Sequence, residues 1–459
     1  MKLLVKDIVK ICHGYLLFGN ENTICENFTK DTRTLKKGDF YIGIKGANFD
    51  GNLLYEDAFL KGAGGCILEK KSLENTEILN FQKPIILVDN AKIALKDLAS
   101  YIREKSLAKF IGITGSVGKT STKDMIYSVL TKSFKTLKTE GNYNNDLGVP
   151  LTMLRLNDEE CAVIEMGMNN LGEIDYLTKI VKPHIAVITN VGTAHIGNLG
   201  SRENILKAKL EIKNGLANDG LLIINNDNDL LHDYYLKHKD NIITIGINNE
   251  SDFQASDIQI DSHGIKYTLT YQNNNYVVSC PIPSLSFVYN SLTAFAVGSL
   301  LKMEPEKIIL GIKDIELTNN RLEFIDTKSK IHIINDSYNA SVDSMKSSLD
   351  ILKLAKGRKI ACLGSMLELG QYSKELHDEI GKYVALNKID ILVTVGDDAK
   401  YIAKSASNNQ MKNDCIYSFD NNEKAIEFLK SNLKKDDTIL IKASNSLKFS
   451  EIVNNLRNI

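Results

Sequence analysis

The feature that most constrains the fold of this chain is a glycine-rich turn between an apolar run and a helical stretch. The run 110–114 predicts a buried strand and 119–130 predicts a helix, and the turn comprises Thr114, Gly115, Ser116, Val117, Gly118, Lys119, Thr120 and Ser121. Glycines let backbone N–H groups converge on phosphate oxygens, Lys119 neutralises phosphate charge, and the Thr120 hydroxyl can bind Mg²⁺. The turn therefore predicts a phosphate-binding loop, although Ile113 stands where the GxxxxGK[ST] pattern begins with glycine. A strand–helix turn that contains Gly-Lys-Thr by chance is the alternative.

The rest of the chain predicts an α/β protein of three domains. A length of 459 residues suggests two to four domains at roughly 100–200 residues each. Short apolar runs alternate with helical stretches, which indicates mainly parallel sheets covered on both faces. We expect a small α/β domain over 1–88, a central doubly wound domain with the phosphate loop over 89–315, and a C-terminal Rossmann-like α/β domain over 316–459. Within the central domain, 253–280 alternates like antiparallel strands and 289–302 predicts a helix.

Composition excludes several function classes. Lys and Arg number 56 against 57 Asp and Glu, so the net charge of −1 argues against a general nucleic-acid binder. No uncharged apolar run reaches the roughly 18 residues of a membrane-spanning helix, and the charged residues within 1–20 favour a short amphipathic helix over a signal peptide. Seven scattered cysteines without a CxxC pair predict buried, reduced thiols. We therefore expect a cytoplasmic protein, and a monomer.

The phosphate loop and several later segments resemble the Mur ligase family, which makes the peptide stem of peptidoglycan precursors. The sequence TGSVGKTS after an apolar strand is similar to the family's ATP loop. Segments 141–151, 165–174 and 189–209 resemble those of the member that adds D-alanyl-D-alanine. The resemblance extends along nearly the whole chain. It implies an ATP-dependent carbon–nitrogen ligase that joins D-Ala-D-Ala to UDP-MurNAc-tripeptide through an acyl phosphate, with two Mg²⁺ ions.

Four side chains are expected to form the catalytic centre, namely Lys119, Glu165, His195 and Lys209. Glu165 follows the expected strand 161–164, so its carboxylate should lie beside the phosphate loop and bind Mg²⁺ with Thr120; a solvated loop acid is the alternative. The resemblance implies that His195 binds a second Mg²⁺, and that Lys209 is the lysine that the family carbamylates. The alternative is that Lys209 is an ordinary exposed lysine of a helix. Lys207 lies two residues earlier, so on a helix its side chain should point away from the site.

The resemblance also implies contacts with the nucleotide and with the two other substrates. Asn290 matches a helix-opening asparagine that contacts adenine, with helix capping as its alternative. Arg321 matches an arginine at the entry of the third domain that would reach the γ-phosphate. Further ATP contacts are expected from Asp336, uridine-diphosphate contacts in the first domain from Thr32, Arg33 and Lys45, and other substrate contacts from Asn142, Asn145, Tyr338 and Asn339.

Departures from the family pattern gather in the third domain, where the amine substrate should bind. Asn335 replaces the first Asp of a DDSYNA motif, Ser365 replaces the Asp of LGDMLELG, and Ser341 and Asn445 lie in two further altered segments. Two alternatives therefore stay open. One is a sister ATP-dependent ligase with a different amine substrate, such as a folylpolyglutamate synthase or another Mur enzyme. The other is a non-catalytic paralogue that binds nucleotide and senses precursors.

Overall fold

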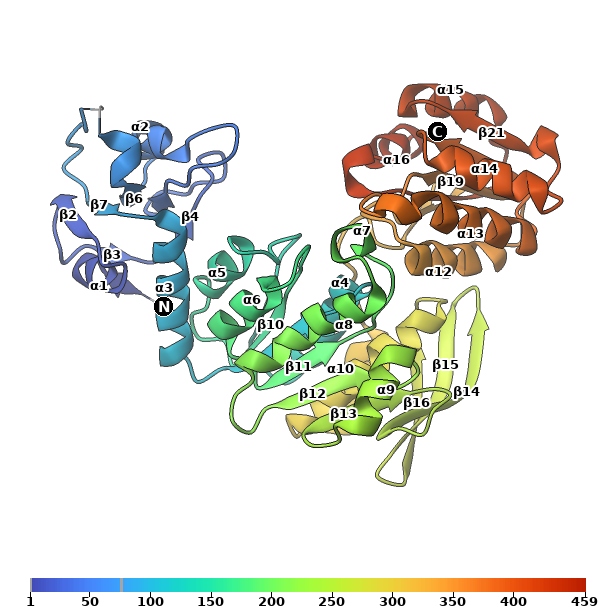
Figure 1. Cartoon of the computed structure of the whole chain (residues 1–459), viewed down its shortest axis with the longest axis horizontal. Helices are drawn as coiled ribbons and strands as arrows, with labels where there is room; N and C mark the ends of the chain where they lie inside the picture. Colours follow the sequence, from blue (N-terminus) through green and yellow to red (C-terminus); the bar gives the residue numbers. More distant parts are fainter. Residues whose placement is uncertain (1, 75–76) are drawn as a thin grey trace.

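Apolar runs of the sequence become buried strands throughout residues 2–74 and 77–459, the part of the chain that this computed structural model describes. These strands form sheets of two, five, nine and six strands in that part of the chain. Figure 1 shows the five-stranded sheet at one end (blue), the nine-stranded sheet in the middle (cyan to yellow) and the six-stranded sheet at the other end (orange to red). The mixed α/β fold with mainly parallel sheets, predicted from the sequence, is confirmed.

The first sheet has the order β2-β7-β6-β5-β4, in which β4 to β7 are parallel and β2 is antiparallel to β7. Its strands β5, β6 and β7 are buried almost throughout, because both faces are covered. A separate pair, β1 and β3, lies beside the N-terminal helix. The elements of this part are β1 (Leu3–Leu4), α1 (Val5–Ile11), β2 (Tyr15–Phe18), β3 (Ile24–Cys25), β4 (Phe28–Thr29), β5 (Phe40–Ile42), α2 (Tyr55–Leu60), β6 (Gly65–Glu69), β7 (Ile85–Val88) and the 3-10 turns Gly51–Leu54 and Lys70–Leu73.

Helix α3 (Ala91–Lys105) joins the first sheet to the central one. The Asn90 side chain caps it by accepting from the Ile93 N–H, and Leu95, Leu98 and Ile102 form a buried stripe at helical spacing. The helix contacts α1 and β6 of the first part and α5 and α6 of the central part. Because α3 packs against elements of both parts, it attaches the first part of the chain to the central sheet.

The central sheet has the order β16-β15-β14-β13-β12-β11-β8-β10-β9. Strands β8 to β14 run parallel, whereas β15 is antiparallel to both of its neighbours, β14 and β16, as the alternation over 253–280 predicts. The elements are β8 (Lys109–Thr114), α4 (Lys119–Leu130), β9 (Thr136–Lys138), α5 (Gly148–Met153), β10 (Cys161–Glu165), α6 (Glu173–Val181), β11 (Ile185–Ile188), α7 (Ile196–Leu199), α8 (Arg202–Leu210), the 3-10 turn Glu211–Gly215, β12 (Leu221–Asn225), α9 (Asp229–Lys237), β13 (Ile242–Gly246), β14 (Phe253–Asp261), β15 (Gly264–Tyr271), β16 (Asn274–Cys280), α10 (Leu285–Leu300) and α11 (Pro305–Lys313).

The chain order reverses around β8, because its two neighbours in the sheet are β10 and β11. Alternate residues of these strands face opposite cores: Ile111 and Ile113 pack with α4 and α10, while Phe110 packs with the residues of α3 and α6. Ligands of doubly wound sheets bind at such a reversal, outside the carboxyl ends of the strands. The phosphate loop follows β8 and therefore lies at this position.

One helix differs from its prediction. Helix α10 begins at Leu285 and not near Tyr289, because the buried residues Phe287 and Val288 extend its apolar side toward Ser284 at the N-cap position. Asn290 thus lies inside the helix, and the capping role considered for it is wrong.

The C-terminal sheet has the order β17-β18-β22-β19-β20-β21 and is parallel except for β17. Edge strand β17 was not predicted, because only two of its four residues are apolar and Phe324 is half exposed. The elements are β17 (Glu323–Asp326), β18 (His332–Asn335), α12 (Val342–Lys353), β19 (Lys359–Gly364), α13 (Ser373–Leu386), β20 (Ile391–Val395), α14 (Ala399–Asn408), β21 (Ile416–Phe419), α15 (Asn422–Asn432), β22 (Thr438–Lys442), α16 (Ser450–Leu456) and the 3-10 turns Gly370–Tyr372, Asn413–Cys415 and Asn445–Leu447.

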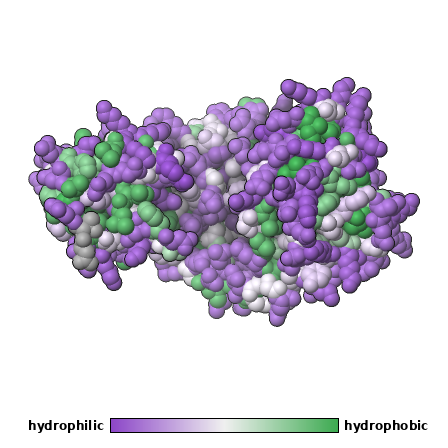
Figure 2. Space-filling model, turned by 90° about the horizontal axis from the view of Figure 1, so that it is seen from above, coloured by the Kyte–Doolittle hydropathy of each residue, from purple (hydrophilic) through white to green (hydrophobic). Residues whose placement is uncertain are grey.

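The face of the molecule in Figure 2 is mostly polar, and the cysteines are free thiols. Figure 2 shows a mostly hydrophilic face on which hydrophobic residues form small separate areas. Among the helices of residues 2–74 and 77–459, none has both the length and the apolar character needed to cross a membrane. All seven cysteines are free and six are buried, and burial raises the pKa of thiols such as Cys362 to about 12.

A buried charge cluster fastens α4 to the segment that leads into the C-terminal sheet. Asp124 accepts hydrogen bonds from the N–H and the hydroxyl of Thr318 at 2.9 and 2.8 Å, and from Lys138 Nζ at 2.9 Å. Lys123 Nζ lies 3.4 Å from the same carboxylate, and neither Lys123 nor Asp124 has an exposed side chain. Although burial opposes ionisation, Lys123 and Lys138 hold the pKa of Asp124 below its usual value.

Replacing Asp124 with asparagine is expected to lower the free energy of unfolding by about 3 kcal/mol, because Lys123 would lose its buried carboxylate. Thermal unfolding followed by circular dichroism measures this, since the chain has no tryptophan. Asp158→Asn is the matched control: its partner Lys135 is exposed, and no measurable shift is expected. Equal shifts for both variants would mean that the cluster does not stabilise the fold.

Candidate active site

The phosphate loop is held in shape by glycines and by the loop that follows β11. A Cβ at Gly115 would lie 1.8 Å from the Thr189 hydroxyl oxygen, and Gly118 has a φ of 83°, so both positions require glycine. Asn190 accepts the Ser116 N–H at its carbonyl (3.1 Å) and the Val117 N–H at its side chain (2.9 Å). Asn190 was not among the predicted site residues, although its place just after a strand at the reversal point is a usable signal.

Lys119 opens α4 and bends back over the loop, where its Nζ donates to the Gly115 carbonyl at 2.7 Å. Loss of contact with water lowers the pKa of Lys119, and Arg321 lowers it further, while Glu165 and Glu368 act in the opposite direction. Lys119 thus lies among two carboxylates and a second cation. It is placed to neutralise phosphate oxygens bound by the loop.

Glu165, at the end of β10, lies behind the loop with 2% of its surface exposed. One carboxylate oxygen accepts from the Thr120 hydroxyl at 2.9 Å and the other from the Asn144 side-chain amide at 2.9 Å. A hydroxyl and a carboxylate beside a phosphate loop are the oxygen ligands that Mg²⁺ prefers. No three His, Cys, Asp or Glu side chains gather into a metal site within residues 2–74 and 77–459, so phosphate oxygens would have to complete the coordination.

Lys209 and Lys207 differ as their helical spacing predicts. Lys209 on α8 is 1% exposed, whereas Lys207 is exposed. Burial, together with the nearby charge of Lys119, holds the pKa of Lys209 well below its usual value. Burial and the neighbouring cation therefore both favour the neutral amine form of Lys209.

His195 connects the central sheet to the C-terminal sheet. Its Nδ1 lies 2.6 Å from a carboxylate oxygen of Glu368, which follows β19, and hydrogen bonding from His195 lowers the pKa of that carboxyl. Both residues have left-handed backbones, with φ of 64° and 65°. Two further contacts join the same surfaces: the Gly197 N–H donates to the Glu368 carbonyl at 3.1 Å, and the Tyr372 hydroxyl to the Gly200 carbonyl at 2.9 Å. In Figure 1, α7 lies directly beneath the C-terminal sheet and its helices.

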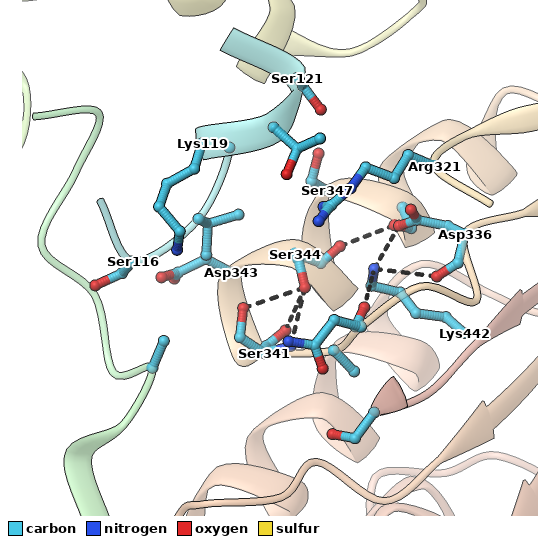
Figure 3. A pocket seen from close by; sticks show the side chains of 18 of the residues that line it. Ser116, Lys119, Ser121, Arg321, Asp336, Ser341, Asp343, Ser344, Ser347 and Lys442 are labelled. Carbon is cyan, nitrogen blue, oxygen red and sulfur yellow. Dashed lines mark hydrogen bonds and ion pairs between the residues drawn. The ribbon is translucent and has the colours of Figure 1, made fainter. Parts of the chain in front are cut away.

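A cavity of about 470 Å³ lies between the phosphate loop and the carboxyl edge of the C-terminal sheet. Figure 3 shows Lys119 and Ser121 entering it from α4 and Arg321, Asp336 and Lys442 from the opposite side. Predicted site residues that line the cavity are Ser116, Val117, Gly118, Lys119, Thr120, Ser121, His195, Asn290, Arg321, Asp336 and Asn339.

Several C-terminal residues of this cavity are paired with one another. Asp336 forms an ion pair with Lys442 and accepts from the Ser348 hydroxyl at 2.7 Å. Arg321 stacks on the ring of Tyr338, with its guanidinium carbon 4.1 Å from the ring centroid. Tyr338 thus lies behind the cavity wall and supports Arg321. Lys442 was not among the predicted site residues, although it opens the altered family segment that contains Asn445.

Other predicted residues lie outside the cavity. Arg33 is exposed and bonds to Asp31 at 2.7 Å, and Lys45 pairs through its backbone with Asp50, both within the first part of the chain. The Asn145 side chain accepts the Gly148 N–H, at the first residue of α5, at 2.8 Å. Thr32, Asn142, Thr114, Gly115, Glu165 and Lys209 also do not line the cavity.

Asn144, which was not predicted, makes the contact with Glu165 that its neighbours Asn142 and Asn145 do not. Three asparagines within four positions are equivalent as a pattern, so the sequence could not separate them.

Two of the residues that depart from the family pattern are buried away from the cavity. Asn335 donates a hydrogen bond to Glu323, and Ser365 accepts the Ala399 N–H. Ser341 and Asn445 do line it.

Comparisons with known proteins are consistent along the whole chain. Residues 113–298 match the Mur ligase middle domain and residues 320–445 match the Mur ligase glutamate ligase domain. The UDP-N-acetylmuramoyl-tripeptide–D-alanyl-D-alanine ligase of Bacillus subtilis is 37% identical over 460 residues, which cover 99% of this chain and 98% of that protein. The crystal structure of MurF from Acinetobacter baumannii is similar with a TM-score of 0.88 at 29% identity, covering 100% of this chain and 99% of that one. MurF from Thermotoga maritima in complex with ADP has a TM-score of 0.80 at 26% identity, covering 94% and 97%.

Proposed function

This chain belongs to the Mur ligase family, and from that premise we propose that it joins D-Ala-D-Ala to UDP-MurNAc-tripeptide with ATP, in the synthesis of peptidoglycan precursors. The family resemblance of the motifs is thereby confirmed. One observation carries the proposal: the phosphate loop, the Thr120–Glu165 pair and the buried Lys209 come together next to a cavity whose other wall is the C-terminal sheet. Such a cavity lets a carboxyl group activated on one side meet an amine that arrives from the other.

The reaction requires activation, because a carboxylate has no good leaving group. The phosphate loop binds the triphosphate, and transfer of the γ-phosphoryl to the tripeptide carboxylate gives an acyl phosphate. Lys119 and Arg321, from opposite walls of the cavity, stabilise the charge of the phosphoryl group as it moves. Attack by the amine of D-Ala-D-Ala then expels phosphate and forms the amide.

We propose two magnesium sites. Thr120 and Glu165 would hold one ion, since their oxygens lie 2.9 Å apart beside the loop. His195 and a carbamylated Lys209 would hold the other: Glu368 engages His195 Nδ1, which directs Nε2 to a metal. When bound, Mg²⁺ supplies Lewis-acid stabilisation of phosphoryl charge.

The low pKa of Lys209 supports its carbamylation, because only a neutral amine reacts with CO₂. The nitrogen bonds to the carbon of CO₂ and releases one proton, so a buried amine becomes an anion. An anion there would also be attracted to the nearby Lys119.

Each predicted domain has a role in this proposal. Residues 1–88 would bind the uridine diphosphate, with Thr32, Arg33 and Lys45 near it; Asn142, Asn145, Tyr338 and Asn339 are proposed contacts of the peptide substrates. Residues 89–315 would bind ATP, with Asn290 near adenine and Asp336 reaching the nucleotide from 316–459, which brings the amine. We place the enzyme in the cytoplasm as a monomer, where nucleotide precursors and ATP are available.

Phosphate release is the test. Wild-type enzyme with ATP and Mg²⁺ is expected to release phosphate only when both UDP-MurNAc-tripeptide and D-Ala-D-Ala are present. Turnover with a different amine, and none with D-Ala-D-Ala in a screen that includes D-Ala-D-Ser and D-Ala-D-lactate, would point to a sister ligase. Tight ATP binding without any turnover would point to a non-catalytic paralogue.

A further inference from the structure

Three carboxylates of the described residues line the cavity, and only one of them lacks a partner within that part of the chain. Asp336 is paired with Lys442, and Glu368 with His195. Asp343, the second residue of α12, makes no hydrogen bond or ion pair with any described residue, and no dashed line reaches it in Figure 3. A carboxylate of this kind is available to a ligand.

The two cations near Asp343 are each paired with another carboxylate. Lys346, one turn along α12, forms an ion pair with Glu379. Across the interface, Arg202 of α8 forms a 2.6 Å ion pair with Asp229. Both cations therefore leave the negative charge of Asp343 largely uncompensated.

Asp343 lies against the loop that carries the proposed reaction centre. A Cβ added to Gly192 would be 2.2 Å from an Asp343 carboxylate oxygen, so this carboxylate touches the backbone of the loop between Thr189 and His195. The Gly192 N–H in turn donates to the Ser116 hydroxyl of the phosphate loop at 3.0 Å. The C-terminal part of the chain thus presents a free anion directly opposite the phosphate loop.

We propose that Asp343 binds the ammonium group of the incoming amine substrate and orients it toward the acyl phosphate. This inference rests on the proposed ligase function. Of the described carboxylates that line the cavity, Asp343 is the unpaired one, and it comes from the wall where the amine should enter. An uncompensated carboxylate attracts an ammonium group.

The same carboxylate can take the proton that blocks attack. One N–H proton of the ammonium passes to the Asp343 oxygen, which becomes a neutral carboxylic acid. The freed electron pair of nitrogen forms the C–N bond, the bond between the acyl carbon and the phosphate oxygen breaks, and a second N–H proton leaves with the phosphate. Water reaches Asp343 through the cavity, yet the surrounding protein raises the pKa of its carboxyl, which favours proton uptake.

The test compares two nucleophiles in Asp343→Asn. For D-Ala-D-Ala, kcat/KM is expected to fall about 10- to 100-fold, through KM because one charge-assisted hydrogen bond is lost and through kcat because the ammonium loses its proton acceptor. Hydroxylamine is uncharged near neutral pH and needs no anion, so formation of hydroxamate from the tripeptide and ATP should stay within about twofold of wild type. Asp350→Asn, an exposed carboxylate on the same helix, should change neither rate.

The outcomes separate this inference from the ligase function. Equal losses with D-Ala-D-Ala and hydroxylamine, or no loss with D-Ala-D-Ala, would overturn the role of Asp343. A wild-type enzyme that makes neither the amide nor the hydroxamate would overturn the ligase function itself.

Discussion

Replacing Lys209 with alanine is expected to lower kcat by at least about 10³-fold, while Lys207→Ala leaves it within about twofold. The two lysines lie on the same helix two residues apart, but Lys209 is buried beside Lys119 and Lys207 is exposed. If Lys209 is carbamylated, its loss removes an anion from the proposed second Mg²⁺ site and several kcal/mol of phosphoryl stabilisation with it. The measurement is steady-state phosphate release at saturating substrates.

Lys207→Ala controls for loss of a lysine from α8 and for general effects on charge. A ¹³C signal from labelled CO₂, present in wild type and in Lys207→Ala but absent in Lys209→Ala, would identify the modified residue independently of activity. Equal activity losses in the two variants would contradict the assignment of Lys209.

Lys119→Ala is expected to lower kcat by at least about 10³-fold, because the phosphate loop would lose the side chain that neutralises the γ-phosphoryl during transfer. Among the described residues, the Lys119 side chain donates a hydrogen bond only to the Gly115 carbonyl, so its removal should leave the fold intact. Activity and the circular dichroism spectrum are measured together.

Lys132→Ala is the matched control for this substitution. Lys132 follows the other end of the same helix and forms an ion pair with Asp314, away from the cavity. It should retain nearly full activity. Lys119→Ala with wild-type turnover would show that the loop does not serve the reaction.

The sequence predicted most of the fold because its elements have strong local signals. Helix α3 begins after a capping asparagine and carries a regular apolar stripe, and both of these signals are visible in the sequence. The strand, turn and helix around Gly115 follow from glycine and helix chemistry alone. Strand β17 escaped prediction because a half-exposed edge strand lacks such a signal, and α10 began earlier than expected because its first turn is as apolar as its middle.

The candidate site was predictable only where residues follow one another along the chain. Helical periodicity separated Lys209 from Lys207, and a strand end placed Glu165. The contacts that complete the site come from the meeting of two sheets: Glu368 reaches His195, and Asp343 reaches Gly192. No spacing in the sequence encodes those pairs, because they depend on how the C-terminal sheet packs on the central one.

The fate of a labelled oxygen tests the central claim most directly. UDP-MurNAc-tripeptide carrying ¹⁸O in its terminal carboxylate is incubated with the wild-type enzyme, ATP, Mg²⁺ and D-Ala-D-Ala, and the released phosphate is examined by mass spectrometry. Activation of the carboxyl group by phosphoryl transfer predicts one ¹⁸O atom in each phosphate, because the carboxylate oxygen leaves with phosphorus. Amide formation accompanied by unlabelled phosphate would contradict this mechanism.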